Sequence, residues 1–340
     1  MKIEELLKEA FLSYEKDNLY DATVYLETIL EIDEYNKRAL IMLSKIYSSV
    51  EKYEIAIKYC EKAYKNYGNE LEVIFIMGYL YQEMGKNRKA LKYYEKYIEK
   101  EKNYHVYLNM GICYMDLKYF RKAHELIDKA IEIDIENPDG YFDKAECFIK
   151  MKKFDEAMKL YKKLKNMKIV EDYYIYMKIG DAYYSIKNIE KTIEYYNISI
   201  NSDFIPISTV YENFYDILIK EKRYDEVELL LINYYNSNFP KVDSLNLEGK
   251  YASYIKDFER AKKVCDKLIM IEPENKHHYI NASFTLEKQH KFDEAIEFIE
   301  KASEYTEDKE IIKKAKKRIK NIKRRYLKKL EKEEWQLIKN

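Results

Sequence analysis

Few residues of this sequence are arranged for catalysis or metal binding. A zinc-protease helix needs a second histidine four residues after the first, and His124 has none there. His277 and His278 are neighbours, so a helix would direct them to different sides, and we expect both at the surface. Gly85 and Gly249 each precede a lysine but lack the upstream glycine and the hydroxyl of a phosphate-binding loop. We therefore expect no enzymatic activity, no cofactor and no metal site.

The cysteines indicate structural thiols. Cys60, Cys113, Cys147 and Cys265 are far apart and form no CxxC pair, so we expect reduced side chains that act as small apolar fillers. The chain is charged from Lys2 onward, unlike a secretory signal. No apolar run approaches the roughly 20 residues that span a bilayer. These features predict a cytoplasmic protein without a transmembrane segment.

The composition favours helices over sheets. The chain has 340 residues, of which only 7 are glycine and 4 are proline, whereas sandwiches, barrels and doubly wound sheets need many turns built from them. Lys+Arg and Asp+Glu are equal at 61 each but are unevenly distributed. Residues 309–340 carry 14 basic and 4 acidic side chains, a net charge of +10, so residues 1–308 carry −10. The sequence predicts an acidic helical body that ends in a basic segment.

A pattern of about 34 residues is repeated nine times. Each copy has a second-helix signal in which a bulky residue often precedes a small one by three positions, as Phe154 precedes Ala157. Twelve residues before that signal lies another residue that is mostly small, and an aromatic residue often follows it by three, as Tyr81 follows Gly78. Small residues at both places let two antiparallel helices approach closely. The nine signal residues are Ala22, Ala56, Ala90, Ala123, Ala157, Thr192, Val227, Ala261 and Ala295.

This pattern resembles the tetratricopeptide repeat family and covers residues 3–308. The resemblance implies an all-α fold, a right-handed superhelical solenoid of antiparallel helix pairs in which the first helix of each repeat lines a concave groove. It also implies a non-enzymatic adaptor or scaffold that binds a protein or peptide segment in that groove. Because terminal repeats must be solvated, we expect residues 309–340 to form a capping helix. The sequence leaves the oligomeric state open.

The resemblance also indicates which side chains face the groove. In repeats three to six the corresponding positions hold carboxylates among aromatic and aliphatic residues, so we expect a cationic or amphipathic segment there. A solvated acidic face without a ligand is the alternative. The expected groove residues are Phe75, Tyr79, Asn109, Ile112, Asp143, Glu146, Lys178 and Asp181. We expect Asn109 to hydrogen-bond a ligand backbone. The acidic tails of chaperones need cations where Asp139 and Asp143 stand, so they are not expected as ligands.

Repeat seven departs most from the pattern. Tyr215 and Val227 replace its two small residues, and Pro206 and Pro240 stand in the flanking linkers. The bulkier side chains are expected to separate its helices or to shift their crossing. One explanation is sequence drift in a tolerant array. The other is a bend within residues 201–242 that separates two parts of the solenoid.

The basic segment follows an apolar stripe on one helix face, with residues recurring at spacings of three and four from Ile312 to Tyr326. Its cations are concentrated in residues 313–329. Those singled out as candidate binding residues are Lys317, Arg318, Lys320, Arg324 and Arg325. Three roles are open: a solvated cap, contact with RNA or an anionic surface, and folding against the acidic groove or a second copy. A peptide-sensing regulatory protein is a further alternative for the whole chain.

Overall fold

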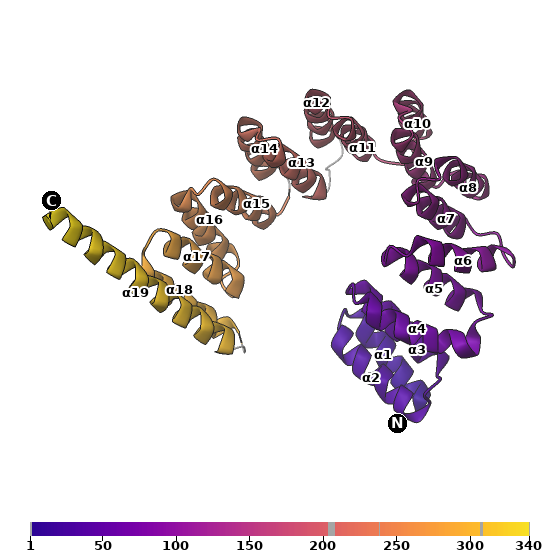
Figure 1. Ribbon diagram of the computed structural model, residues 1–340, viewed down its shortest axis with the longest axis horizontal. Coiled ribbons are helices and arrows are strands. Elements are labelled where there is room, and N and C mark those ends of the chain that lie inside the picture. Colours follow the sequence, from indigo (N-terminus) through magenta and orange to yellow (C-terminus); the bar gives the residue numbers. More distant parts are fainter. Residues whose placement is uncertain (1, 203–207, 238, 307–308, 340) are drawn as a thin grey trace. The chain divides into compact units, whose positions relative to one another are not determined.

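The computed structural model describes residues 2–202, 208–237, 239–306 and 309–339, with side chains through residue 333. These residues form nineteen α-helices, a 3₁₀ turn at Ser303–Tyr305 and no strand (Figure 1). Eighteen of the helices form nine consecutive pairs. The first helices are α1 (Ile3–Glu15), α3 (Lys37–Ser49), α5 (Leu71–Glu83), α7 (Tyr104–Asp116), α9 (Pro138–Lys150), α11 (Asp172–Ser185), α13 (Ser208–Lys220), α15 (Lys241–Tyr254) and α17 (Lys276–Lys288). The second helices are α2 (Leu19–Ile32), α4 (Tyr53–Tyr67), α6 (Asn87–Ile98), α8 (Phe120–Ile133), α10 (Phe154–Met167), α12 (Ile189–Ile200), α14 (Tyr224–Asn236), α16 (Phe258–Ile271) and α18 (Phe292–Ala302). The final helix, α19, spans Lys309–Lys339.

A short turn joins the two helices of every pair, and each turn contains one residue with a left-handed backbone. In repeat three the amide of Lys86, which follows that residue, donates to the carbonyl of Tyr81 at 2.8 Å and closes the helix end. The left-handed residues have φ between 58° and 68° and are Asp17, Glu51, Gly85, Lys118, Lys152, Lys187, Lys222, Lys256 and His290. Only Gly85 adopts this conformation without the steric cost of a Cβ atom. The chain therefore builds its turns with very little glycine.

The small residues of the pattern lie where paired helices touch. A Cβ atom on Gly78 of α5 would lie 2.5 Å from Cε1 of Tyr94 in α6, and one on Gly111 would lie 2.6 Å from Cγ1 of Ile127. In repeat two the buried hydroxyl of Ser44 donates to the carbonyl of Ala56 at 3.1 Å. The repeat spacing thus records close helix contacts, as predicted.

The recurring aromatic residues connect one repeat to the repeat before it. Tyr81 of α5 stacks on Tyr93 of α6, with ring centroids 5.6 Å apart, and its hydroxyl donates to Glu61 of α4 at 3.2 Å. Tyr114 of α7 likewise donates to Glu95 of α6 at 3.4 Å. Each such tyrosine therefore contributes apolar contact within its own repeat and a charge-assisted hydrogen bond to its neighbour.

The helices form two compact units, residues 1–195 and residues 196–340, which are described separately. In the first unit a continuous apolar core extends from α3 to α9, and smaller clusters lie around α1–α3 and α9–α11. In the second unit an aromatic stack of Tyr211 and Tyr234, with ring centroids 4.2 Å apart, joins α13 to α14. The first unit contains every groove residue expected from the sequence.

Repeat seven buries its two bulkier residues. Tyr215 of α13 is 1% exposed and Val227 of α14 is fully buried. The ring of Tyr215 meets that of Tyr251 in α15 edge to face, with centroids 6.5 Å apart, so it fills space between two repeats. The linkers include residues 203–207 and 238, which lie outside the described residues. The bend within residues 201–242 therefore stays a prediction.

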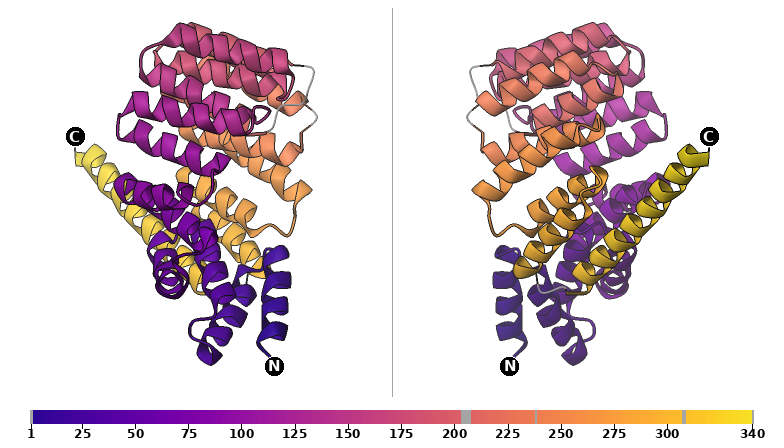
Figure 2. Two further views of the ribbon diagram at one scale, coloured as in Figure 1. Left: turned by 90° about the vertical axis from the view of Figure 1, so that its right-hand side faces the viewer. Right: turned by 90° about the vertical axis from the view of Figure 1, so that its left-hand side faces the viewer.

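The first half of α19 covers the last repeat. Ile312 and Ile319 are buried against α17 and α18 in one apolar cluster, and Tyr326 stacks on His290 with ring centroids 4.1 Å apart. In both Figures 1 and 2 the C-terminal half of α19 runs on beyond α17 and α18. The apolar stripe of the sequence is thus used for packing within the chain.

Candidate functional site

The first helices of the first unit present a row of equivalent side chains on one face. Four positions of each helix lie on the same side. They are the positions six, three and two residues before the small residue and the position directly after it. The residues directly after the small one are, from α1 to α11, Phe11, Lys45, Tyr79, Ile112, Glu146 and Asp181. The row therefore changes from aromatic and basic residues at its start to acidic residues at its end, and a pocket lies at each end.

The pocket at the later end, here called the Asp143 pocket, has a volume of about 560 Å³ and lies between α7, α9, α10 and α11. Its walls contain the rings of Phe142, Tyr161 and Tyr174, with the Phe142 and Tyr174 centroids 5.2 Å apart. It is lined by Leu108, Ile112, Asp139, Phe142, Asp143, Glu146, Ile149, Lys150, Tyr161, Tyr174, Lys178, Asp181, Ala182 and Ser185. The structure thus brings together five of the predicted groove residues. They are Ile112, Asp143, Glu146, Lys178 and Asp181.

The electrostatics of this pocket centre on Asp143. Burial, reinforced by the carboxylates of Glu146 and Asp139, raises the pKa of Asp143 to about 7. Glu146 pairs with Lys150 at 2.9 Å, whereas Asp143 makes no ion pair among the described residues. Four acidic and two basic side chains line the pocket, so its net charge is −2 when all are ionised. A cationic group entering it would stabilise the ionised form of Asp143.

The other predicted residues, Phe75, Tyr79 and Asn109, lie on α5 and α7 and do not line the Asp143 pocket. Phe75 packs against the rings of Tyr94 and Tyr97, each with its centroid 6.3 Å away. Tyr79 is 37% exposed. The buried hydroxyl of Tyr94 donates to Oε1 of Gln82 at 2.8 Å, and the contact expected between Asn109 and a ligand backbone stays a prediction.

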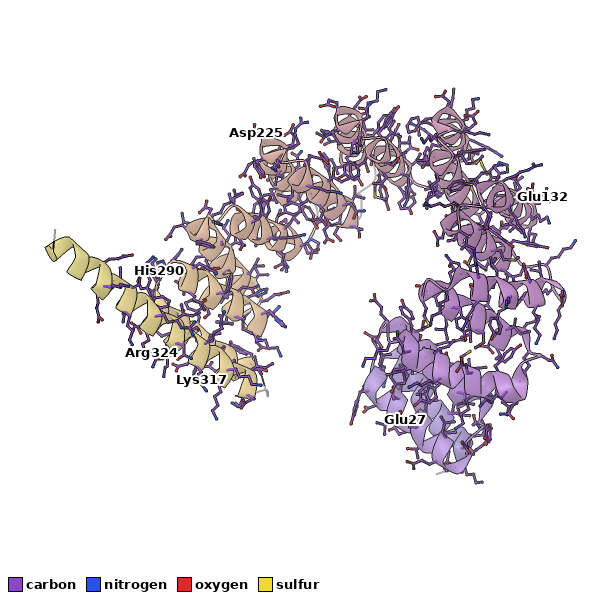
Figure 3. All side chains as sticks on the ribbon, in the orientation of Figure 1. Glu27, Glu132, Asp225, His290, Lys317 and Arg324 are labelled. Atoms are coloured by element: carbon purple, nitrogen blue, oxygen red, sulfur yellow. The ribbon has the colours of Figure 1, made fainter. Side chains whose placement is uncertain are left out.

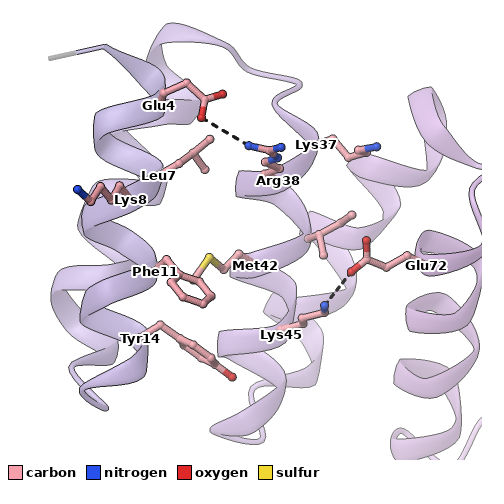
Figure 4. Close-up of a pocket in the computed structure, with 11 residues that line it drawn as sticks. Glu4, Leu7, Lys8, Phe11, Tyr14, Lys37, Arg38, Met42, Lys45 and Glu72 are labelled. Carbon is pink, nitrogen blue, oxygen red and sulfur yellow. Dashed lines mark hydrogen bonds and ion pairs between the residues drawn. The ribbon is translucent and has the colours of Figure 1, made fainter.

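A second pocket, here called the N-terminal pocket, was not anticipated from the sequence. It lies between α1, α3 and α5 and has a volume of about 670 Å³ (Figure 4). It is lined by Glu4, Leu7, Lys8, Phe11, Tyr14, Lys37, Arg38, Ile41, Met42, Lys45 and Glu72. The same repeat positions that indicated the Asp143 pocket were available in repeats one and two. In those repeats they hold residues such as Phe11, Arg38 and Lys45, so helix phase is the sequence signal for this pocket.

The rim of the N-terminal pocket is basic. Four cations and two carboxylates line it, a net charge of +2. Arg38 pairs with Glu4 at 3.5 Å and Lys45 with Glu72 at 2.8 Å, as the dashed lines in Figure 4 show. Both pairs are more than half exposed on each partner, so they contribute little to stability and can exchange partners. The two ends of the row thus have opposite charge.

The four cysteines and His278 are buried. Among the described residues no group of three or more His, Cys, Asp or Glu is placed to hold a metal ion. Burial raises the pKa of both Cys60 and Cys113 to about 12, which keeps these thiols protonated at neutral pH. His278, expected at the surface, is buried, and its Nε2 lies 2.7 Å from Oε2 of Glu272. The expectation for His278 was wrong because its ring fills space where α17 begins.

The cations of α19 fall into two groups. Three of them pair with carboxylates of the last repeat: Lys316 with Glu300 at 2.9 Å, Arg318 with Glu287 at 2.7 Å and Lys323 with Asp293 at 2.6 Å. Arg318, a predicted binding residue, is thus part of the cap. The others up to Lys332 are exposed, and Figure 3 labels Lys317 and Arg324 among them. Those that share the face opposite the apolar stripe are Lys313, Lys317, Lys320, Arg324 and Lys328. Arg325 is exposed beside that face.

Known proteins share this sequence pattern and fold. Residues 37–69 match the family model of the tetratricopeptide repeat, and residues 83–164 match the family described as anaphase-promoting complex, cyclosome, subunit 3. A TPR repeat-containing protein of Methanocaldococcus jannaschii is 25% identical over 181 residues, which are 53% of this chain. The match covers 31% of that relative, so this chain spans less than a third of its length.

Two solved structures show the same fold. A tetratricopeptide repeat protein from Parabacteroides merdae matches 72% of this chain and 96% of its own, with 18% identity and a TM-score of 0.58. PilW, a type IV pilus biogenesis factor, matches 58% of this chain and 93% of its own, with 17% identity and a TM-score of 0.52.

The paired helices and these matches define an all-α solenoid of repeats. Both family models and the curated relative support a protein of the tetratricopeptide repeat family. Proteins of this family generally act as non-catalytic scaffolds. In the described part of the chain, no helix combines the length and the apolar character needed to cross a membrane.

Proposed function

We propose that this chain is a non-enzymatic cytoplasmic scaffold that binds a linear protein segment along the first helices of its first unit. A cationic side chain of that segment occupies the Asp143 pocket. The segment is amphipathic, because apolar residues line the pocket beside the charged ones. An acidic segment would be repelled by the same carboxylates.

The observation that carries this proposal is the half-buried carboxyl of Asp143. It lies among three other acidic residues of the pocket and has no ion pair among the described residues, although Lys178 lines the same pocket. A lysine or arginine entering the pocket would form a charge-assisted hydrogen bond with Asp143. The rings of Tyr161 and Tyr174 could also contact its charge. A bound cation thus relieves the repulsion among the carboxylates.

The test is selection from a displayed library of linear peptides, followed by fluorescence anisotropy with the intact protein. We expect enrichment of peptides that combine lysine or arginine with apolar residues. The Asp143→Asn variant should weaken their binding at least tenfold at pH 8. Glu132→Gln removes one exposed carboxylate from α8, outside the pocket, and should leave binding unchanged. Equal binding by wild type and Asp143→Asn would refute the proposed site.

A second candidate function is contact with RNA through the exposed face of α19. The five cations of that face lie within 313–328, about 22 Å of helix at 1.5 Å per residue. Five cations on one helix face suit the regularly spaced charges of a phosphate backbone. Replacing Lys317 and Arg324 by glutamine keeps the Arg318 ion pair of the cap. We expect these changes to reduce both RNA affinity and its dependence on salt.

The control for this candidate uses anionic lipid vesicles. If vesicles bind and RNA does not, the face recognises a membrane surface and the RNA function is wrong. If neither probe responds to the Lys317 and Arg324 changes, α19 serves only as a cap.

A further inference from the structure

The N-terminal pocket holds apolar surface in a concave, accessible position. Phe11 is 53% exposed near its centre, beside Leu7 and Met42 (Figure 4). Tyr14, at one side, is 38% exposed. A ligand side chain can cover Phe11 without a large rearrangement of the protein, because Phe11 already faces the pocket. Grouped apolar side chains in a hollow with a polar rim are typical of a binding site.

The charge of the rim selects what can accompany an apolar side chain. Lys8 is exposed and has no ion pair among the described residues. Arg38 and Lys45 are held only by solvent-exposed pairs, which a ligand carboxylate can replace at little cost. Lys37 pairs with Glu70, which does not line the pocket. Carboxylates next to an apolar ligand residue therefore meet four cations, whereas lysine or arginine would be repelled.

We infer that the N-terminal pocket binds an apolar side chain flanked by carboxylates, as the second anchor of the segment whose cationic side chain occupies the Asp143 pocket. The ligand class is thus a linear segment with an acidic, apolar cluster at one end and a basic side chain at the other. This inference rests on the proposed function, because the first anchor of the segment is the Asp143 pocket. The inference adds the chemistry of the acidic, apolar end of the segment and the distance between the two pockets.

The distance follows from the order of the helices. The N-terminal pocket lies mainly on α1 and α3 and the Asp143 pocket mainly on α9 and α11, so the shortest path between them runs from α3 past α5 and α7 to α9. Three steps between neighbouring packed helices of about 8–10 Å each give roughly 24–30 Å. Extended chain covers this distance with about seven to nine residues. A ligand with fewer residues between its anchors cannot reach both pockets.

The test uses synthetic fluorescein-labelled peptides with the full-length protein. One peptide carries an acidic cluster around phenylalanine, one carries a lysine-rich apolar cluster, and two join both clusters through Gly/Ser linkers of three or ten residues. We expect the ten-residue linker to raise affinity at least tenfold over either half alone. The three-residue linker, which spans only about 10 Å, should give no such gain.

Variants assign each half to its pocket. Lys8→Glu combined with Arg38→Glu should abolish binding of the acidic half and leave the basic half unchanged. Phe11→Ala should weaken binding of the acidic half at least fivefold. Because the Phe11 side chain is exposed, the variant should keep its fold, which circular dichroism checks. Lys58→Glu reverses an exposed charge on α4, outside the pocket, and is the matched control.

The outcomes separate this inference from the proposed function. If the basic half binds through Asp143 but the acidic half adds nothing, the proposed function stands and the inference is wrong. If the acidic half binds through Phe11 but Asp143→Asn leaves the affinity for the basic half unchanged, the proposed site is wrong. The two-anchor ligand is then wrong as well. Equal affinity of the three-residue and ten-residue peptides would also overturn the inference.

Discussion

Replacing Asp143 by asparagine should stabilise the protein most at neutral and basic pH and not at all below pH 4. The pKa of Asp143 is about 7, compared with the ordinary value of 3.8, because burial and neighbouring carboxylates disfavour its charge. A shift of about 3 units corresponds to about 4 kcal/mol at full effect. The carboxyl is only partly buried, and solvent screening reduces this to about 2 kcal/mol. Asparagine keeps the shape of the side chain and removes the charge.

The direction of the pH dependence follows from the two pKa values. The folded protein holds the Asp143 proton up to pH about 7, whereas the unfolded chain releases it near pH 4. The wild type therefore loses stability as the pH rises from about 4 to about 7. The gain from Asp143→Asn should be near zero below pH 4, increase through this interval and stay constant above it.

The assay is urea unfolding followed by circular dichroism at pH 4, 5, 6, 7 and 8. The measured quantity is the difference in the free energy of unfolding between the variant and the wild type. Glu132→Gln serves as the control for removal of an exposed carboxylate. A difference that is the same at pH 4 and pH 8, or that has the opposite sign at pH 8, would refute the electrostatic account of this pocket.

Three further predictions concern packing. Gly78→Ala should destabilise the protein by about 1–3 kcal/mol, because the new Cβ would lie 2.5 Å from the fully buried ring of Tyr94. Gly85→Ala should destabilise it by only about 1 kcal/mol, because Gly85 has open space around it but a φ of 68°. The midpoints of urea unfolding of the two variants measure this difference. Arg260→Met should lower the free energy of unfolding by about 2 kcal/mol. Arg260 donates two hydrogen bonds to Glu228, at 2.7 and 3.0 Å, and one to Glu248 at 3.0 Å. Arg260→Lys should lose less stability than Arg260→Met but stay below the wild type, because lysine cannot reproduce the two-pronged contact. Cys60, with a pKa of about 12, should react with iodoacetamide at pH 8 only in urea concentrations that unfold the chain, and reaction in the native protein would contradict its burial.

The repeat could be predicted from the sequence because its signal is steric. Every signal residue from Ala22 to Ala295 is buried where helices meet, and the spacing of 33 to 35 residues fixes one helix pair per copy. Close packing leaves no room for larger side chains at most of these places. Tyr215 and Val227 show the limit of this reasoning. Their size was visible in the sequence, but the space that receives them depends on the neighbouring repeats.

The Asp143 pocket could be predicted only in part. The family's groove positions indicated Asp143, Glu146 and Asp181, because these positions depend on helix phase alone. Tyr161 belongs to a second helix, where the sequence pattern indicates core packing, yet its ring lines the pocket.

The distribution of charge shows why a count of charged residues is a weak guide to partners. Residues 1–308 carry −10 in total, which predicts an acidic groove, and the Asp143 pocket is indeed lined by more acids than bases. The N-terminal pocket lies within the same acidic body but has a net charge of +2. In α19, likewise, three of the cations are paired with the last repeat, and a separate set is exposed. The charge of the surface that a partner contacts therefore depends on helix phase and on local ion pairs. A ligand matched to the average charge alone would occupy only one of the two pockets.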